Sequence, residues 1–145
     1  MLKGISALLS PDLLHALRAM GHGDDVAVVD ANFPAASLAQ RLVRADGHAA
    51  TDMLRAMLQL MPVDDLREDP LRVMEVTGDA TSKPPIIGEF ERIASGIEGR
   101  TLHARPLPRD DFYAAARSAY VVVATGELRL YGNVLVRKGV IAPSE

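Results

Sequence analysis

The chain has 145 residues, an ordinary length for one domain, and its 16 basic and 19 acidic side chains give a net charge of −3. Hydrophobic residues make up 48% and charged residues 24%, which is typical of folded globular proteins rather than disordered ones. The basic residues are scattered, which argues against a nucleic-acid binder, and the absence of cysteine excludes disulfides, cysteine-zinc sites and thiol nucleophiles.

The sequence also carries no targeting or membrane signal. No run approaches the roughly 18 apolar residues that a membrane-spanning helix needs. Residues 1–10 lack the continuous apolar segment of a secretory signal. We therefore expect a cytoplasmic protein with no membrane or nucleic-acid partner, and one domain over residues 1–145.

Helix and strand patterns alternate along the chain. A first helix is predicted after Ser10, which can cap it, with Pro11 in its first turn and Gly21 as the stop signal. The continuous apolar run at 26–29 is typical of a strand buried on both faces. In chain order, the remaining patterns predict a strand at 41–44, a helix at 50–61, a strand at 71–76, a loop at 77–85, a helix at 86–97, a strand at 102–104, a helix at 110–118, a strand at 120–125, and a final bent strand or hairpin from 128–130 and 134–137.

This alternation predicts the fold class. Strands that alternate with helices favour α/β, with a mixed, largely buried β-sheet and helices on both of its faces. There is no internal repeat, linker or low-complexity tract. We therefore expect one three-layer domain.

Conventional cofactor and metal motifs are absent. The chain has no phosphate-binding Gly-rich loop, no dinucleotide-binding glycine fingerprint after a strand, and no His-Glu-x-x-His pair. The four histidines, at 15, 22, 48 and 103, show no metal-ligand spacing. We therefore expect neither a metal nor a cofactor.

His22 is a candidate acid/base group. It lies in Gly21-His22-Gly23-Asp24, just after the predicted first helix, whose C-terminal partial charge favours an imidazolium. A histidine can donate or accept a proton near neutral pH. The alternative is a solvated loop histidine, and the local pattern alone does not exclude it.

Asp30 is a candidate binding residue. It follows the buried strand at 26–29, and open α/β sheets bind ligands at the carboxyl ends of their strands. A carboxylate there can accept hydrogen bonds from two sugar hydroxyls. The alternative is an Asx turn, since Asp30-Ala31-Asn32-Phe33-Pro34 is rich in turn formers.

Two further segments carry candidate polar groups. Arg109 opens the helix predicted near 110–118, although it can equally be an ordinary surface arginine. Tyr131-Gly132-Asn133 interrupts an apolar C-terminal strand, where a glycine allows close approach to the backbone and the Asn133 amide can both donate and accept. The alternative for this segment is a β-bulge or hairpin turn.

Together these segments resemble the L-fucose mutarotase family, the sister family of the D-ribose pyranases. The resemblance spans nearly the whole chain in order, although the stretch from 64 to 101 contributes little. It rests on Met1-Leu2-Lys3-Gly4-Ile5-Ser6, Leu9-Ser10-Pro11, Met20-Gly21-His22-Gly23-Asp24, Asp30-Ala31-Asn32-Phe33-Pro34, Arg44-Ala45-Asp46-Gly47, Thr125-Gly126-Glu127 through Tyr131-Gly132-Asn133, and Lys138-Gly139-Val140.

The resemblance implies an isomerase that interconverts the α and β anomers of a free sugar, with no cofactor. It implies that His22 is the catalytic acid/base and that Asp30, Arg109, Tyr131, Gly132 and Asn133 bind the sugar. Arg109 is transferred by its position four residues before Tyr113 rather than by a long motif. The resemblance also implies a ring-shaped homodecamer with its sites near subunit contacts.

The substrate and the function class are open to alternatives. Asn32-Phe33-Pro34 is similar to the fucose branch, whereas the ribose branch tends to carry Gly-Leu-Pro, so L-fucose or a related monosaccharide is favoured over D-ribose. A non-catalytic sugar-binding module would use the same Asp, Arg and Asn side chains. It would not need a titrating group at His22.

Overall fold

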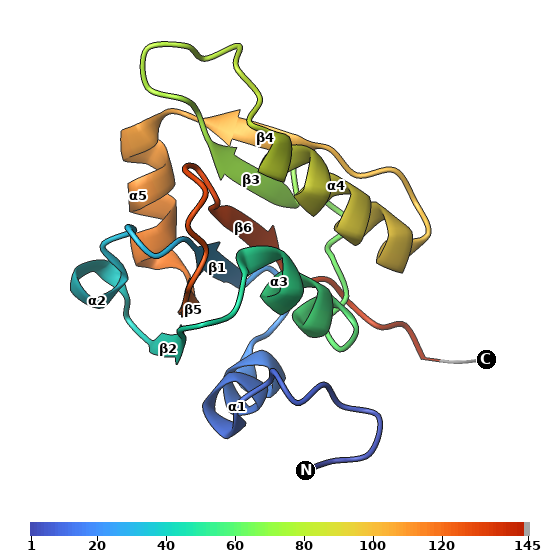
Figure 1. The fold of residues 1–145 in the computed structure, drawn as a ribbon. Helices are drawn as coiled ribbons and strands as arrows, with labels where there is room; N and C mark the ends of the chain where they lie inside the picture. The colour runs from blue at the N-terminus through green and yellow to red at the C-terminus, as the bar shows by residue number, and fades with distance from the viewer. Residues whose placement is uncertain (144–145) are drawn as a thin grey trace.

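A computed structural model describes residues 1–143, which form five helices and six strands (Figure 1). In chain order they are α1 (Pro11–Ala19), β1 (Asp25–Val29), α2 (Ala35–Leu38), β2 (Leu42–Ala45), α3 (Ala50–Leu58), β3 (Leu71–Met74), α4 (Pro85–Glu98), β4 (Ala104–Leu107), α5 (Arg109–Ser118), β5 (Val121–Thr125) and β6 (Val134–Arg137). None of the described helices is both long and apolar enough to cross a bilayer.

The strands form one mixed sheet in the order β2-β5-β1-β6-β3-β4. β6 runs antiparallel to both of its neighbours, β1 and β3, and the other pairs are parallel. The carboxyl ends of β1 to β5 and the start of β6 therefore meet at one edge of the sheet. We call this the carboxyl edge, and the opposite one the amino edge.

The sheet is covered on both faces, as its apolar strands predict. Along β1, Val26 and Val28 pack into a core with α1, α3 and α4, while Ala27 and Val29 pack into a second core with α2 and α5. This two-residue alternation follows from the pleat, which turns successive side chains to opposite faces. The expected α/β architecture with helices on both faces is confirmed.

Local sequence signals predicted the start of α1 correctly, whereas the bounds of α3 and β4 differ from those predicted. The Ser10 Oγ accepts a hydrogen bond from the Leu13 N–H at 3.2 Å, so α1 begins at the expected cap. The helix predicted at 50–61 ends three residues early, at Leu58. The strand predicted at 102–104 instead runs over 104–107, where β4 is an edge strand that tolerates Pro106.

One predicted strand is absent, and one short helix was not predicted. Residues 128–130 form no strand: Leu128 and Leu130 are exposed, and Tyr131 has a left-handed backbone with φ of 61°. Residues 126–133 are a loop between β5 and β6, which we call the 126–133 loop. Helix α2 was not expected, because it is a single turn without a side-chain cap.

Candidate functional site

A polar cleft of about 230 Å³ opens at the carboxyl edge. Its residues come from the loops after β1 and β3, from the last residue of β3, from helix α5 and from the 126–133 loop. They lie at the end of the sheet where parallel strands commonly bind ligands. They are Asp30, Asn32, Phe33, Met74, Thr77, Arg109, Tyr113, Leu130, Tyr131 and Asn133. The topology thus brings together four of the residues predicted to bind the ligand: Asp30, Arg109, Tyr131 and Asn133.

Asp30 and Asn133 form the polar floor of this cleft. The Asn133 Nδ2 donates to the Asp30 carboxylate at 2.9 Å, and the Asp30 N–H donates back to the Asn133 Oδ1 at 2.8 Å. Both residues are buried, and burial raises the pKa of the Asp30 carboxyl. Asp30 also accepts a hydrogen bond from the Asn32 N–H at 3.0 Å. The same carboxylate therefore closes the expected Asx turn and lines the cleft.

Tyr131 forms part of the wall of the cleft. Its hydroxyl accepts a hydrogen bond from the Thr77 N–H at 3.0 Å, which lowers the pKa of the phenol. Because the hydroxyl accepts at this point, its own proton is free to be donated to a ligand. Gly132 does not line the cleft. A Cβ built there would lie 2.7 Å from Glu127 Cγ, so this position needs glycine for packing inside the loop.

An aromatic face completes the cleft. Phe33 stacks on Tyr113 with ring centroids 5.3 Å apart, and the Arg109 guanidinium lies 5.4 Å from the centre of the Tyr113 ring. Arg109 also reaches the Tyr113 hydroxyl at 3.4 Å, since the two residues lie four apart on α5. Sequence reasoning used Tyr113 only as a positional marker and missed Met74 and Thr77, which only the topology brings to the cleft.

His22 lies at the amino edge, in the turn between α1 and β1. Its Nε2 is 3.2 Å from the Asp64 Oδ1, and its side chain is 42% exposed. The turn is held by the Gly23 N–H, which donates to the Lys138 carbonyl at 2.9 Å. The structure therefore presents His22 to solvent while fixing the loop that carries it.

Asp64 is the buried partner of His22. Burial raises its pKa, but hydrogen bonds from the Leu66 N–H and from His22 outweigh this effect and lower the pKa below the ordinary value. Its second oxygen, Oδ2, has no hydrogen-bond partner within residues 1–143. Sequence reasoning missed Asp64, which lies in a stretch that matched no motif.

One chain does not bring His22 to the Asp30 cleft. His22 precedes β1 and Asp30 follows it, and the five residues of β1 alone span about 16 Å at the usual rise of an extended strand. The larger cleft near His22, about 520 Å³, is mainly apolar and lined by residues such as Leu2, Leu60 and Ile141. Over residues 1–143, no three or more His, Asp or Glu side chains lie together as metal ligands would.

Comparison with known proteins supports the resemblance seen in the sequence. Residues 3–141 match the RbsD / FucU transport protein family. The fucose mutarotase of Homo sapiens is 44% identical over 147 residues, covering 97% of this chain and 95% of the relative. The L-fucose mutarotase of Actinobacillus pleuropneumoniae serotype 5b (strain L20) is 39% identical over 140 residues, with 97% of each chain covered.

A solved structure gives the same result. The fucose mutarotase from Streptococcus pneumoniae, in complex with L-fucose, is 41% identical and superposes with a TM-score of 0.90, covering 97% of this chain and all of the other. Family match, sequence identity and fold agree over nearly the full length. This chain therefore belongs to the RbsD / FucU family.

Proposed function

We propose that this chain is a mutarotase that interconverts the α and β anomers of L-fucose, with the sugar in the Asp30 cleft and His22 as the acid/base group. The observation that carries the proposal is the Asp30–Asn133 pair at the carboxyl edge, beside Arg109 and an aromatic face. A carboxylate and an amide that already fix each other can bind several hydroxyls with little reorganisation. The choice of L-fucose as the substrate comes from the fucose mutarotases to which this chain is similar.

The cleft suits a deoxyhexose. Asp30 and Asn133 retain hydrogen-bonding capacity toward hydroxyls, and Arg109 adds a cation at the rim. The stacked Phe33 and Tyr113 offer an apolar surface to the carbon face of a pyranose ring. Because Phe33 belongs to the Asn32-Phe33-Pro34 segment that separates the two branches, this contact favours L-fucose over D-ribose.

The proposed chemistry needs only proton transfer. Ring opening removes the proton of the anomeric hydroxyl and protonates the ring oxygen, and closure on the other face of the carbonyl gives the second anomer. His22 exchanges one proton, and Asp64 orients its ring. Tyr131 is the candidate for the second proton, since it lines the cleft and its hydroxyl proton is free.

The separation of the two edges requires a second copy of the chain. We place His22 of one subunit at the Asp30 cleft of the next, which is a heterologous contact that closes into a ring. Leu128 and Leu130 are exposed beside the cleft, and Leu60 and Ile141 are exposed near His22, as such a contact needs. The resemblance sets the ring at a decamer, and the cysteine-free sequence supports a cytoplasmic location.

The test is saturation-transfer NMR between the anomer signals of L-fucose, D-ribose and other free sugars. We expect L-fucose exchange well above the buffer rate at catalytic protein concentration, and unchanged exchange after EDTA treatment. Exchange at the buffer rate for every sugar would reject the enzyme and leave a binding module. Loss of activity in EDTA with recovery on adding a divalent metal would reject metal-free proton transfer.

A further inference from the structure

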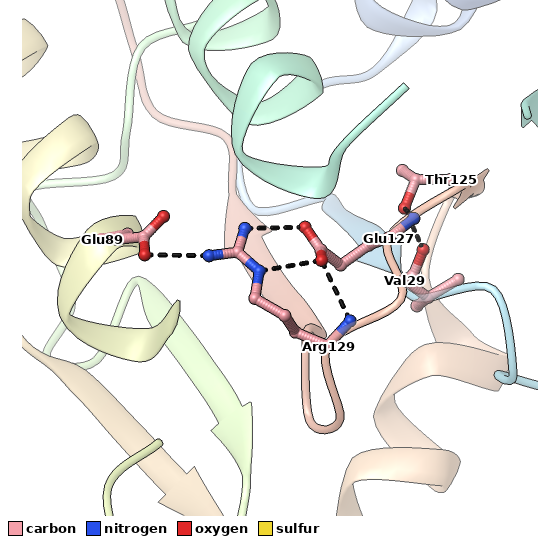
Figure 2. Close-up of polar contacts among 5 residues, drawn as sticks. All are labelled: Val29, Glu89, Thr125, Glu127 and Arg129. Carbon is pink, nitrogen blue, oxygen red and sulfur yellow. Dashed lines mark hydrogen bonds and ion pairs between the residues drawn. The ribbon is translucent and has the colours of Figure 1, made fainter. Parts of the chain in front are cut away.

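The 126–133 loop is tied to the rest of the chain by an ion-paired network that the proposed reaction does not use. Figure 2 shows Arg129 between two carboxylates, one on the same loop and one on helix α4. Arg129 donates to both oxygens of Glu127 at 2.9 Å, through Nε and Nη2, and through Nη1 to Glu89 at 2.8 Å. The guanidinium therefore bridges the loop to a helix on one face of the sheet.

Glu127 links this network to the floor of the cleft. Its side chain is only 5% exposed, and its carbonyl accepts from the N–H of Ala31, the residue after Asp30, at 2.9 Å. Its N–H donates to the Thr125 Oγ1, and this hydroxyl donates to the Val29 carbonyl at 2.7 Å. Glu127 thus ties the loop to both sides of Asp30 along the chain, and Figure 2 shows the side that passes through Thr125 to Val29.

The loop folds tightly over the Glu127 side chain. A Cβ at Gly132 would meet Glu127 Cγ at 2.7 Å and the Arg129 carbonyl at 3.0 Å. Gly132 lies between Tyr131 and Asn133, the two polar residues that the loop supplies to the cleft. Glu127 and Arg129 therefore pack directly against the backbone that joins the two binding residues.

An ordinary surface ion pair would contribute little and position nothing. Glu127 differs because its carboxylate is buried and the Arg129 hydrogen bonds lower its pKa to about 2. Over residues 1–143 the loop takes no part in strand pairing, and the Glu127–Arg129 contacts add to the hydrogen bonds that hold it.

We propose that Glu127 and Arg129 are positioning residues that set the placement of Tyr131 and Asn133 for sugar binding. The inference rests on the proposed function, since it assigns the two residues to the same cleft. Neither side chain lines that cleft, so both act through the loop rather than on the sugar.

The test compares Arg129→Met with Arg105→Met. Both changes remove an arginine that is paired at 2.8 Å with an exposed carboxylate, but Arg105 pairs with Asp69 and has no contact with the loop. We expect Arg129→Met to raise the Kd and KM for L-fucose about tenfold or more, as a misplaced binding group does, and to lower kcat as well, because Tyr131 is displaced together with Asn133. Arg105→Met should leave all three unchanged.

A merely structural role predicts a different result. It would lower the folded fraction, and hence apparent kcat, at unchanged Kd and KM. A folded Arg129→Met with wild-type Kd, or an equal rise in Arg105→Met, would overturn the proposal. If Arg129→Met does not fold, Arg129→Lys keeps the charge without the two-pronged contact, and we expect it to raise Kd in the same direction.

Hydrogen exchange separates failure of this inference from failure of the proposed function. The Asp30 N–H donates to Asn133, so its protection reports the placement of Asn133 without any sugar. We expect Arg129→Met to lower that protection at least tenfold relative to Arg105→Met. If the wild-type protein does not bind L-fucose but Arg129→Met still loses protection at the Asp30 N–H, the positioning role of Glu127 and Arg129 stands and the proposed substrate is rejected. Unchanged protection would overturn the loop assignment.

Discussion

At the carboxyl edge of the sheet, the two buried polar side chains of the cleft, Asp30 and Asn133, each make more than one hydrogen bond. Asp30 is fixed by Asn133 and by its own Asx turn, and Tyr131 is fixed by the Thr77 backbone. At the amino edge, His22 has a single side-chain partner, Asp64, and remains 42% exposed. The cleft residues are held by contacts within the chain, whereas His22, the proposed proton-transfer group, is left open to a second surface.

This difference fits the two tasks. Affinity is higher when the binding groups need no rearrangement, because a side chain that is already ordered loses little conformational entropy on association. In the proposed mechanism, proton transfer needs one group placed at one atom, and contact with a second subunit would position the half-exposed His22. Asp64 is buried behind it, so the ring keeps one orientation while its outer face stays available.

His22→Gln should have the largest effect on turnover. Glutamine keeps hydrogen-bonding capacity but cannot exchange a proton near neutral pH, so the anomer-exchange rate should fall about 10²- to 10⁴-fold. The affinity for L-fucose should change less than about tenfold, since the carboxyl edge is untouched. NMR exchange and calorimetric titration measure the two quantities, with circular dichroism as the folding control. A folded variant at near wild-type rate would move the catalytic role to Tyr131 or another group.

The Glu127 carboxylate at the carboxyl edge should make the free energy of unfolding depend on pH. Arg129 hydrogen bonds lower the pKa of Glu127 from 4.5 to about 2. A lowered pKa stabilises the folded state above the unfolded value, so this contribution is complete above pH 4.5 and is lost as the pH falls toward 2. It corresponds to about 3 kcal/mol.

Urea unfolding from pH 6 down to pH 2, at one protein concentration, measures this contribution. Glu127→Gln should lose less unfolding free energy over that range than wild type does, by about 3 kcal/mol, because it has no carboxylate to protonate. Parallel pH profiles for the two proteins would show that the Glu127 carboxylate is not held by the loop.

Asp30→Asn should have the smallest effect of the three. It keeps the shape but removes the charge that strengthens hydrogen bonds to hydroxyls. We expect a loss of about 1–3 kcal/mol in kcat/KM, carried mainly by KM. Steady-state exchange rates over a range of L-fucose concentrations separate the two constants. Unchanged rate and affinity in a folded variant would leave Asp30 as a turn former only.

Much of this picture was predictable from the residues, because the signals were local. Ser10 marked the start of α1, and the apolar run at 26–29 marked a doubly buried strand. Asp30 and Asn133 lie at the ends of two strands, where the fold class predicts a ligand. The placement of His22 and Asp30 at opposite edges was not predicted, although His22 precedes β1 and Asp30 follows it.

What could not be predicted depends on contacts distant in sequence. Tyr113 and Thr77 reach the cleft only through the order of the strands, and Asp64 meets His22 across 42 residues of chain. The segment at 128–130 imitates a strand by alternating leucine with arginine. Its leucines are in fact exposed, and Arg129 is held by Glu127.

The most direct test of the account combines the two edges in one oligomer. His22→Gln and Asp30→Asn chains are co-expressed with different affinity tags, and the mixed oligomers are isolated through both. If His22 of one subunit serves the Asp30 cleft of the next, about one quarter of the sites in a random mixture carry both wild-type residues. At L-fucose concentrations well below KM, where the Asp30→Asn variant is impaired, we predict that exchange recovers to about that fraction of the wild-type rate. Activity no higher than the mean of the two parent variants would contradict catalysis shared between subunits.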